Sequence, residues 1–133
     1  VLGAREFLGR HNTEGWLFLN FDGVSADAPL RVLSKEGGPL DALAADPELI
    51  SLAESVGRKW PELKAEPLRY GSGLPYDSSP VLAAGGRGMS IVNQRGAIPD
   101  YHWPSDTFER VSSETFARAA RFGEALLRKL DLD

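Results

Sequence analysis

The sequence predicts an α/β fold in which helices cover a central sheet that is mostly parallel or mixed. Short apolar runs alternate with stretches of helical periodicity, and glycines and prolines separate them. The expected order is helix, strand, strand, helix, strand, a possible short helix, strand and helix. No repeat of 20–50 residues interrupts this order. The 133 residues are enough for one domain, which we expect to span residues 1–133.

The first third of the chain is expected to supply one helix and two strands. Residues 1–11 are predicted to form a short helix. Residues 16–21 (WLFLNF) form a largely apolar run that ends at Asp22. This run is short for a helix and favours a strand that is buried on both faces. Residues 31–33 are predicted to form a second short strand.

The middle of the chain is expected to supply a helix and a strand. Asp46 can cap free amide groups at a helix start, and Pro47 suits the first helical position. Residues 49–60 then carry apolar side chains at helical spacing. Residues 63–70 are predicted to form a strand, although Pro67 interrupts it.

The last third is expected to hold a short helix at residues 80–84, a buried strand at residues 89–93 and a long loop at residues 94–111. Ser112 or the serine after it is predicted to cap a final helix. The apolar stripe of that helix is expected to consist of Phe116, Ala119, Ala120, Gly123, Leu127 and Leu130.

Composition excludes several classes of protein. There are 15 Lys and Arg against 19 Asp and Glu, giving a net charge of −4, which argues against a nucleic-acid binder and a polybasic membrane-surface protein. The apolar runs are too short to span a bilayer. The absence of cysteine excludes disulfides, thiolate catalysis and cysteine-based metal sites. We therefore expect a soluble protein, and its compartment, cytoplasmic or secreted, stays open.

Two predicted loops follow strands, which is where α/β folds usually bind ligands. Asp22 directly follows the first predicted strand, and its carboxylate suits a ligand or a base. The alternative is a turn residue that caps the strand end. The loop at residues 94–111 follows the last predicted strand.

That loop carries His102, which lies among aromatic residues between Pro99 and Pro104. A neutral imidazole is a good zinc ligand when another group holds its second nitrogen. Asp106 is close enough in sequence to hold it, or to fix the loop by accepting amide groups. The alternative is a histidine that only packs within its loop.

A third loop, at residues 71–80, contains Tyr76 and Ser78, either of which could contact a substrate. Turn chemistry alone also explains its composition. The sequence has no phosphate-binding G-x-x-x-x-G-K-[ST] motif, no G-x-S-x-G motif and no H-E-x-x-H motif. A nucleotide-binding domain is therefore a weaker interpretation.

Taken together, these segments resemble the C-terminal half of a co-catalytic zinc aminopeptidase. The family contains bacterial leucyl aminopeptidases, glutamate carboxypeptidase and glutaminyl cyclases. Residues 1–8 (VLGAREFL) are similar to its LLGSRAF helix start, and residues 19–22 (LNFD) to its NLDM strand end. Residues 76–80 (YDSSP) are similar to its SDHAPF loop, and residues 101–107 (YHWPSDT) closely match YHTPSDT. The resemblance covers nearly the whole chain in the correct order.

The resemblance implies a peptidase that uses two zinc ions. Asp22 would bind one ion and His102 the other, with Asp106 as a supporting residue behind the ligands. In the family, a further aspartate bridges the ions, which orient the amino terminus of a peptide substrate and generate hydroxide. A glutamate acts as general base.

The sequence lacks the remaining parts of that site. It contains no His-x-Asp motif and no Glu-Glu pair, so we expect no catalytic residue in this chain and a general base upstream of it. The chain would then be a fragment of a peptidase, one partner of a missing N-terminal half, or a relic that kept the fold. We favour a partial metallopeptidase domain that is inactive alone.

A partial domain should expose a sheet edge and an apolar face, which favour self-association. We therefore expect a homo-oligomer or a chain that pairs with its missing half. The alternative function is a non-catalytic α/β interaction domain that kept the peptidase fold and lost the metal site.

Overall fold

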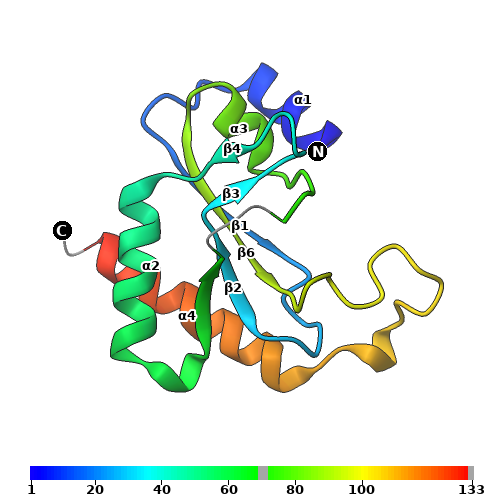
Figure 1. Cartoon of the computed structure of the whole chain (residues 1–133). Coiled ribbons are helices and arrows are strands. Elements are labelled where there is room, and N and C mark those ends of the chain that lie inside the picture. The colour runs from blue at the N-terminus through cyan, green and yellow to red at the C-terminus, as the bar shows by residue number, and fades with distance from the viewer. Residues whose placement is uncertain (69–71, 132–133) are drawn as a thin grey trace.

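The computed structural model describes residues 1–68 and 72–131. Its helices are α1 (Leu2–Arg10), α2 (Pro47–Lys59), α3 (Ser79–Ala83) and α4 (Ser113–Leu130), with 3-10 turns η1 (Pro61–Leu63) and η2 (Phe108–Arg110). Its strands are β1 (Leu17–Asp22), β2 (Leu30–Leu33), β3 (Lys35–Glu36), β4 (Leu43–Ala44), β5 (Ala65–Leu68) and β6 (Arg87–Asn93). The predicted α/β class is confirmed (Figure 1).

Four strands form one mixed sheet in the order β1-β6-β2-β5. Strand β1 runs parallel to β6, and β2 runs parallel to β5, while β2 and β6 are antiparallel. At one end of the sheet Asp22 pairs with Val92, and Leu30 pairs with both Asn93 and Ala65. The loops that follow β1 and β6 therefore meet the starts of β2 and β5 at this end.

Helices α2 and α4 pack against each other and cover one face of the sheet (Figure 1). The main core lies between them and the sheet, with Leu49 and Val56 from α2 and Phe122 and Leu126 from α4. A second, smaller apolar cluster lies apart from this core and consists of Leu33, Tyr76, Val92 and Ile98, with Leu74 and Tyr101 packed against it. It joins the loop at residues 94–111 to the sheet.

Strand β1 is correctly predicted as a strand, but its predicted burial on both faces is wrong. Leu17 is 38% exposed and Phe21 is 39% exposed. The reason is that β1 lies at the edge of the described sheet and pairs only with β6. The expected open sheet edge is thus present.

Strand β5 lies at the opposite edge of the sheet and, among the described residues, pairs only with β2. This position explains how a strand can contain Pro67, since proline is tolerated where no further strand needs its amide. The predicted strand at residues 63–70 is confirmed over Ala65–Leu68. Residues 69 and 70 of that prediction lie outside the described residues.

Both long helices begin where the sequence predicts. The Asp46 carboxylate accepts hydrogen bonds from the amides of Glu48 (2.9 Å) and Leu49 (3.1 Å). The Ser112 hydroxyl accepts one from the Thr115 amide at 3.3 Å. These side chains satisfy amides that the first helical turn leaves without a partner.

The stripe predicted for α4 is partly wrong. Ala119 and Gly123 are buried, but Ala120 is exposed, Phe116 is 56% exposed and Leu127 is 59% exposed. The buried face is centred on Phe122 and Leu126 instead. The reason is that α4 turns this face toward α2 and the sheet, and its exposed apolar residues lie beside the open edge of β1.

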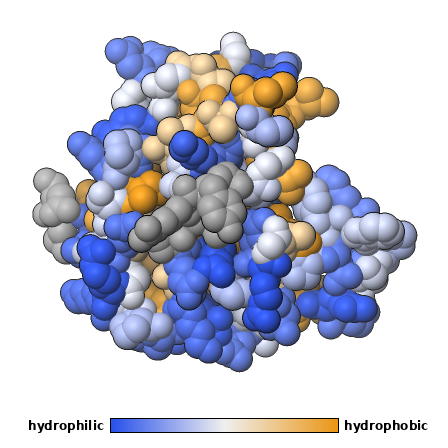
Figure 2. Space-filling model, viewed as in Figure 1, coloured by the Kyte–Doolittle hydropathy of each residue, from blue (hydrophilic) through white to orange (hydrophobic). Residues whose placement is uncertain are grey.

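Helix α1 is also confirmed, and none of its residues is buried. In the view of Figure 2, apolar side chains gather at the top of the molecule, around the ends of α1 and α3. No helix in the described part of the chain has the length and apolar character needed to cross a membrane.

Candidate metal site

Strands β1 and β6 bring two of the predicted site residues to one place. Asp22 is the last residue of β1, and the loop that carries His102 leaves the adjacent end of β6. Both side chains line a pocket of about 430 Å³, which Asp100 and Asp106 also line. The two loops that the sequence places after strands therefore lie at one end of the sheet.

The loop around His102 is held by short-range contacts. The Trp103 amide donates to the Asp100 carbonyl at 2.9 Å, and the Asp106 amide donates to the Trp103 carbonyl at 3.0 Å. The Ser105 hydroxyl donates to the Asp100 carboxylate at 2.6 Å. These bonds form consecutive turns that fix the backbone on both sides of the imidazole.

The backbone at His102 has a φ of +59°, in the left-handed region that side chains with a Cβ seldom adopt. Its ring is exposed and stacks on Tyr101, with ring centroids 3.9 Å apart. Unusual backbone conformations concentrate at functional sites, where the surrounding structure maintains them. Asp100 in the same loop has a φ of +55°, so both residues belong to the turns that carry the imidazole, and the role of His102 as a ligand stays a prediction.

Asp106 lines the same pocket as His102, but the described contacts include no hydrogen bond between them. Its amide, rather than its carboxylate, helps to fix the loop. The supporting role of the Asp106 carboxylate stays a prediction.

The pocket is acidic. Asp22, Asp27, Asp100 and Asp106 line it together with one cationic residue, Arg110. The carboxylate of Asp100 is engaged by Ser105 and lies 3.6 Å from the Arg110 guanidinium. The other three carboxylates form no ion pair within the described part of the chain. This charge suits a cation or the amino group of a substrate.

The donor types fit zinc, but their number does not. Carboxylate oxygen and imidazole nitrogen are common zinc ligands, and a catalytic site takes about three of them from the protein. No cluster of three or more such residues stands in a metal-binding arrangement in residues 1–68 and 72–131. Asp22 and His102 are therefore an incomplete ligand set.

Tyr76 and Ser78, the predicted substrate contacts, are both buried and do not line this pocket. The Tyr76 side chain packs against Leu33 and Ile98, and its hydroxyl has no hydrogen-bond partner in the described structure. Burial raises the pKa of this phenol, and the negative charge of Asp22 acts in the same direction. Their contact with a substrate stays a prediction.

Ser78 instead belongs to a polar cluster that the sequence analysis missed. The Glu36 carboxylate is 1% exposed and accepts hydrogen bonds from the hydroxyls of Ser78 (2.8 Å), Ser79 (2.7 Å) and Ser90 (2.6 Å). Asn20 donates to Ser90 at 3.2 Å. These bonds link β1 and β3 to α3 and β6, which lie far from them in sequence, so no local pattern identifies the cluster.

Comparison with known proteins gives a fold but no family. No family model matches the sequence, and no curated protein matches it by sequence. Two crystal structures of a zinc aminopeptidase from Bacillus subtilis are similar, with TM-scores of 0.73 and 0.72 and 18% identity. They cover 97% of this chain, which spans 32% of theirs. The fold is thus that of part of an aminopeptidase-like domain.

A second fold likeness is more distant. The 5'-methylthioadenosine/S-adenosyl homocysteine nucleosidase of Campylobacter jejuni matches with a TM-score of 0.61 and 11% identity, covering 96% of this chain and 75% of its own. The aminopeptidase and the nucleosidase thus both resemble this chain in their α/β arrangement. The fold alone does not determine which reaction a protein catalyses.

Proposed function

We propose that this chain is the C-terminal part of a zinc-dependent peptidase of the aminopeptidase type, which hydrolyses peptide bonds. The observation that carries the proposal is that Asp22 and His102 line one acidic pocket in a fold similar to that of a zinc aminopeptidase. Each residue would supply one ligand to a different zinc ion. The remaining ligands and the general base would come from outside this chain.

We further propose that the open side of β1 receives the rest of the peptidase domain. Within residues 1–68 and 72–131, β1 pairs only with β6, so its other edge offers amide and carbonyl groups to a further strand. Beside it, Phe21 and Val24 line a hollow of about 590 Å³ with Phe116 and Leu127 of α4. The length of the similar aminopeptidase outside the matched region supports this occupant, since the chain spans 32% of it.

The second candidate function is a non-catalytic interaction domain. The lack of a three-residue metal group in the described structure favours it. In that case the open edge of β1 and the apolar hollow beside it would bind a partner protein, and no reaction would be catalysed.

Zinc titration followed by NMR tests the metal proposal, because the chain offers its own control. The two histidines are His102, in the acidic pocket, and His11, which is exposed at the end of α1. The ring signals of His102 should respond at lower zinc concentration than those of His11. Because the two residues are proposed to bind different ions, Asp22→Asn should leave the His102 response unchanged, and a weakened response would contradict that assignment.

His102→Asn is the matched variant for this titration, because asparagine tolerates a positive φ better than alanine. It should remove the response at the lower zinc concentration, and His11→Asn should retain it. Equal responses of the two histidines in the unmodified chain would contradict the metal proposal. The chain alone is expected to show no peptidase activity.

A further inference from the structure

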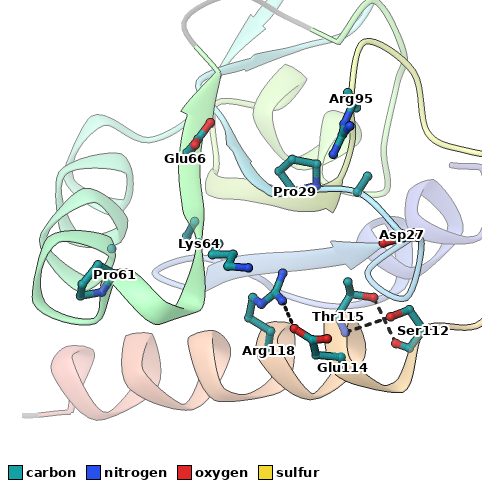
Figure 3. A pocket seen from close by; sticks show the side chains of 13 residues that line it. Asp27, Pro29, Pro61, Lys64, Glu66, Arg95, Ser112, Glu114, Thr115 and Arg118 are labelled. Atoms are coloured by element: carbon teal, nitrogen blue, oxygen red, sulfur yellow. Dashed lines mark hydrogen bonds and ion pairs between the residues drawn. The ribbon is translucent and has the colours of Figure 1, made fainter.

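A second polar cavity lies at the same end of the sheet, between η1, the start of β5 and the first turns of α4 (Figure 3). Its volume is about 570 Å³. It is separate from the acidic pocket, and Asp27 is the residue that lines both. Three cationic residues line it, namely Lys64, Arg95 and Arg118.

These cations are unequally neutralised. Arg118 is 9% exposed, and its guanidinium binds Glu114, one turn earlier in α4, at 2.5 Å. Neither the Lys64 ammonium nor the Arg95 guanidinium forms an ion pair or a side-chain hydrogen bond with any described residue. Figure 3 shows Lys64 and Arg118 extending into the cavity from the β5 side and from α4.

Three carboxylates, those of Asp27, Glu66 and Glu114, also line the cavity, but two of them are already paired. The Glu66 carboxylate pairs with Arg31, which does not line the cavity. Glu114 is engaged by Arg118, so Asp27 is the remaining free carboxylate among the lining residues. The N-terminus of α4 contributes the positive end of its dipole to the same wall.

We propose that this cavity binds the oxyanion group of a small organic molecule, either a phosphate or a carboxylate. Lys64 and Arg118 both extend into the cavity, no described carboxylate pairs with Lys64, and Arg118 is held in place by burial and by its bond to Glu114. An oxyanion between them would accept charge-assisted hydrogen bonds from both. The volume exceeds that of the oxyanion alone and matches pockets that hold small organic ligands. This inference does not depend on the peptidase proposal.

Titration of the chain with inorganic phosphate and, separately, with acetate tests the proposal at constant ionic strength, with chloride as the reference anion. NMR signals of Lys64, Thr115 and Arg118 report binding. Lys64→Met keeps the length of an exposed side chain and removes its charge, and should weaken the binding about tenfold. Lys35→Met removes an exposed charge outside the cavity and should leave binding unchanged.

The two anions distinguish the two sources of the oxyanion. Tighter phosphate binding assigns a phosphorylated ligand, and tighter acetate binding assigns a carboxylate ligand. Responses no larger than those to chloride, or equal weakening by Lys64→Met and Lys35→Met, would overturn the proposal. The full NMR spectrum of each variant confirms that the fold is intact.

Discussion

The ring of Phe21 on β1 lies directly over Gly123 on α4. A Cβ atom added at Gly123 would stand 2.8 Å from the Phe21 Cζ atom, closer than such contacts ordinarily occur. A glycine in the interior of an 18-residue helix lowers the stability of that helix. The close approach of the Phe21 ring explains why a residue without a Cβ atom stands at position 123. Helix α4 is thereby fitted to the edge strand.

A double-mutant cycle measures this fit. Gly123→Ala should destabilise the chain by about 1 kcal/mol, because overcrowding at Phe21 outweighs the gain in helix propensity. In the Phe21→Ala background the same substitution should stabilise by about 1 kcal/mol. Urea denaturation of the four proteins gives the coupling energy, and additive effects would show that the two residues do not interact.

The open edge of β1 should cause the isolated chain to self-associate at micromolar concentration. Phe116→Lys together with Leu127→Lys places charges on the apolar surface beside that edge and should shift the chain toward monomer in sedimentation velocity. Phe108→Lys is the control, since this exposed phenylalanine lies in η2, outside that surface. A chain that is monomeric before substitution would contradict the expectation.

The buried Glu36 carboxylate should be essential for stability. Glu36→Ala leaves the hydroxyls of Ser78 and Ser90 without their acceptor and opens a cavity, with an expected cost of about 3 kcal/mol. Glu62→Ala, at an exposed position in η1, should change stability by no more than about 0.5 kcal/mol. Chemical denaturation measures both, and similar small losses would show that the serine hydroxyls find other partners.

Asp46 should make the stability depend on pH. Its hydrogen bond to the Arg87 side chain lowers the pKa of its carboxyl below the ordinary 3.8, and the amides of Leu49 and Glu48 act in the same direction. Because the folded pKa is lowered, the stabilisation is present above about pH 4 and disappears as the pH falls through the folded value. The unmodified chain should therefore lose stability more steeply than Asp46→Asn below pH 4.

Asp46→Asn isolates the charge because asparagine is an equally good capping residue. Asp46→Ala removes the cap as well and should cost about 1 kcal/mol at neutral pH. Thermal unfolding from pH 2.5 to 7 separates the two effects. Parallel pH profiles for Asp46→Asn and the unmodified chain would contradict the role of the carboxylate charge.

The sequence predicted those features that depend on neighbouring residues. The side chains of Asp46 and Ser112 cap amides within one helical turn. Strand β1 follows from a local apolar run. The sequence also placed Asp22 and the loop at residues 94–111 after strands, but the pocket that Asp22 and His102 share is a finding of the structure.

Features that depend on distant contacts were missed or misassigned. The burial of β1 could not be inferred because an apolar run does not reveal how many strands flank it. The two-residue strands β3 and β4 are too short to show alternation, so Glu36 gave no signal of its burial. Phe116 and Leu127 follow helical spacing, but their side of α4 faces the open edge rather than the core.

Helix α1 buries none of its residues, and Phe7 and Leu8 line a small cavity of about 180 Å³ together with Asn20 and Ser78. Detaching α1 exposes little apolar surface that was buried. Its local opening should therefore cost a small fraction of the global free energy of unfolding. Its amide protons should exchange with solvent far sooner than those of α4. Each opening would bring water to Asn20 and Ser78 at the edge of the Glu36 cluster, because these two residues line the cavity beside Phe7 and Leu8.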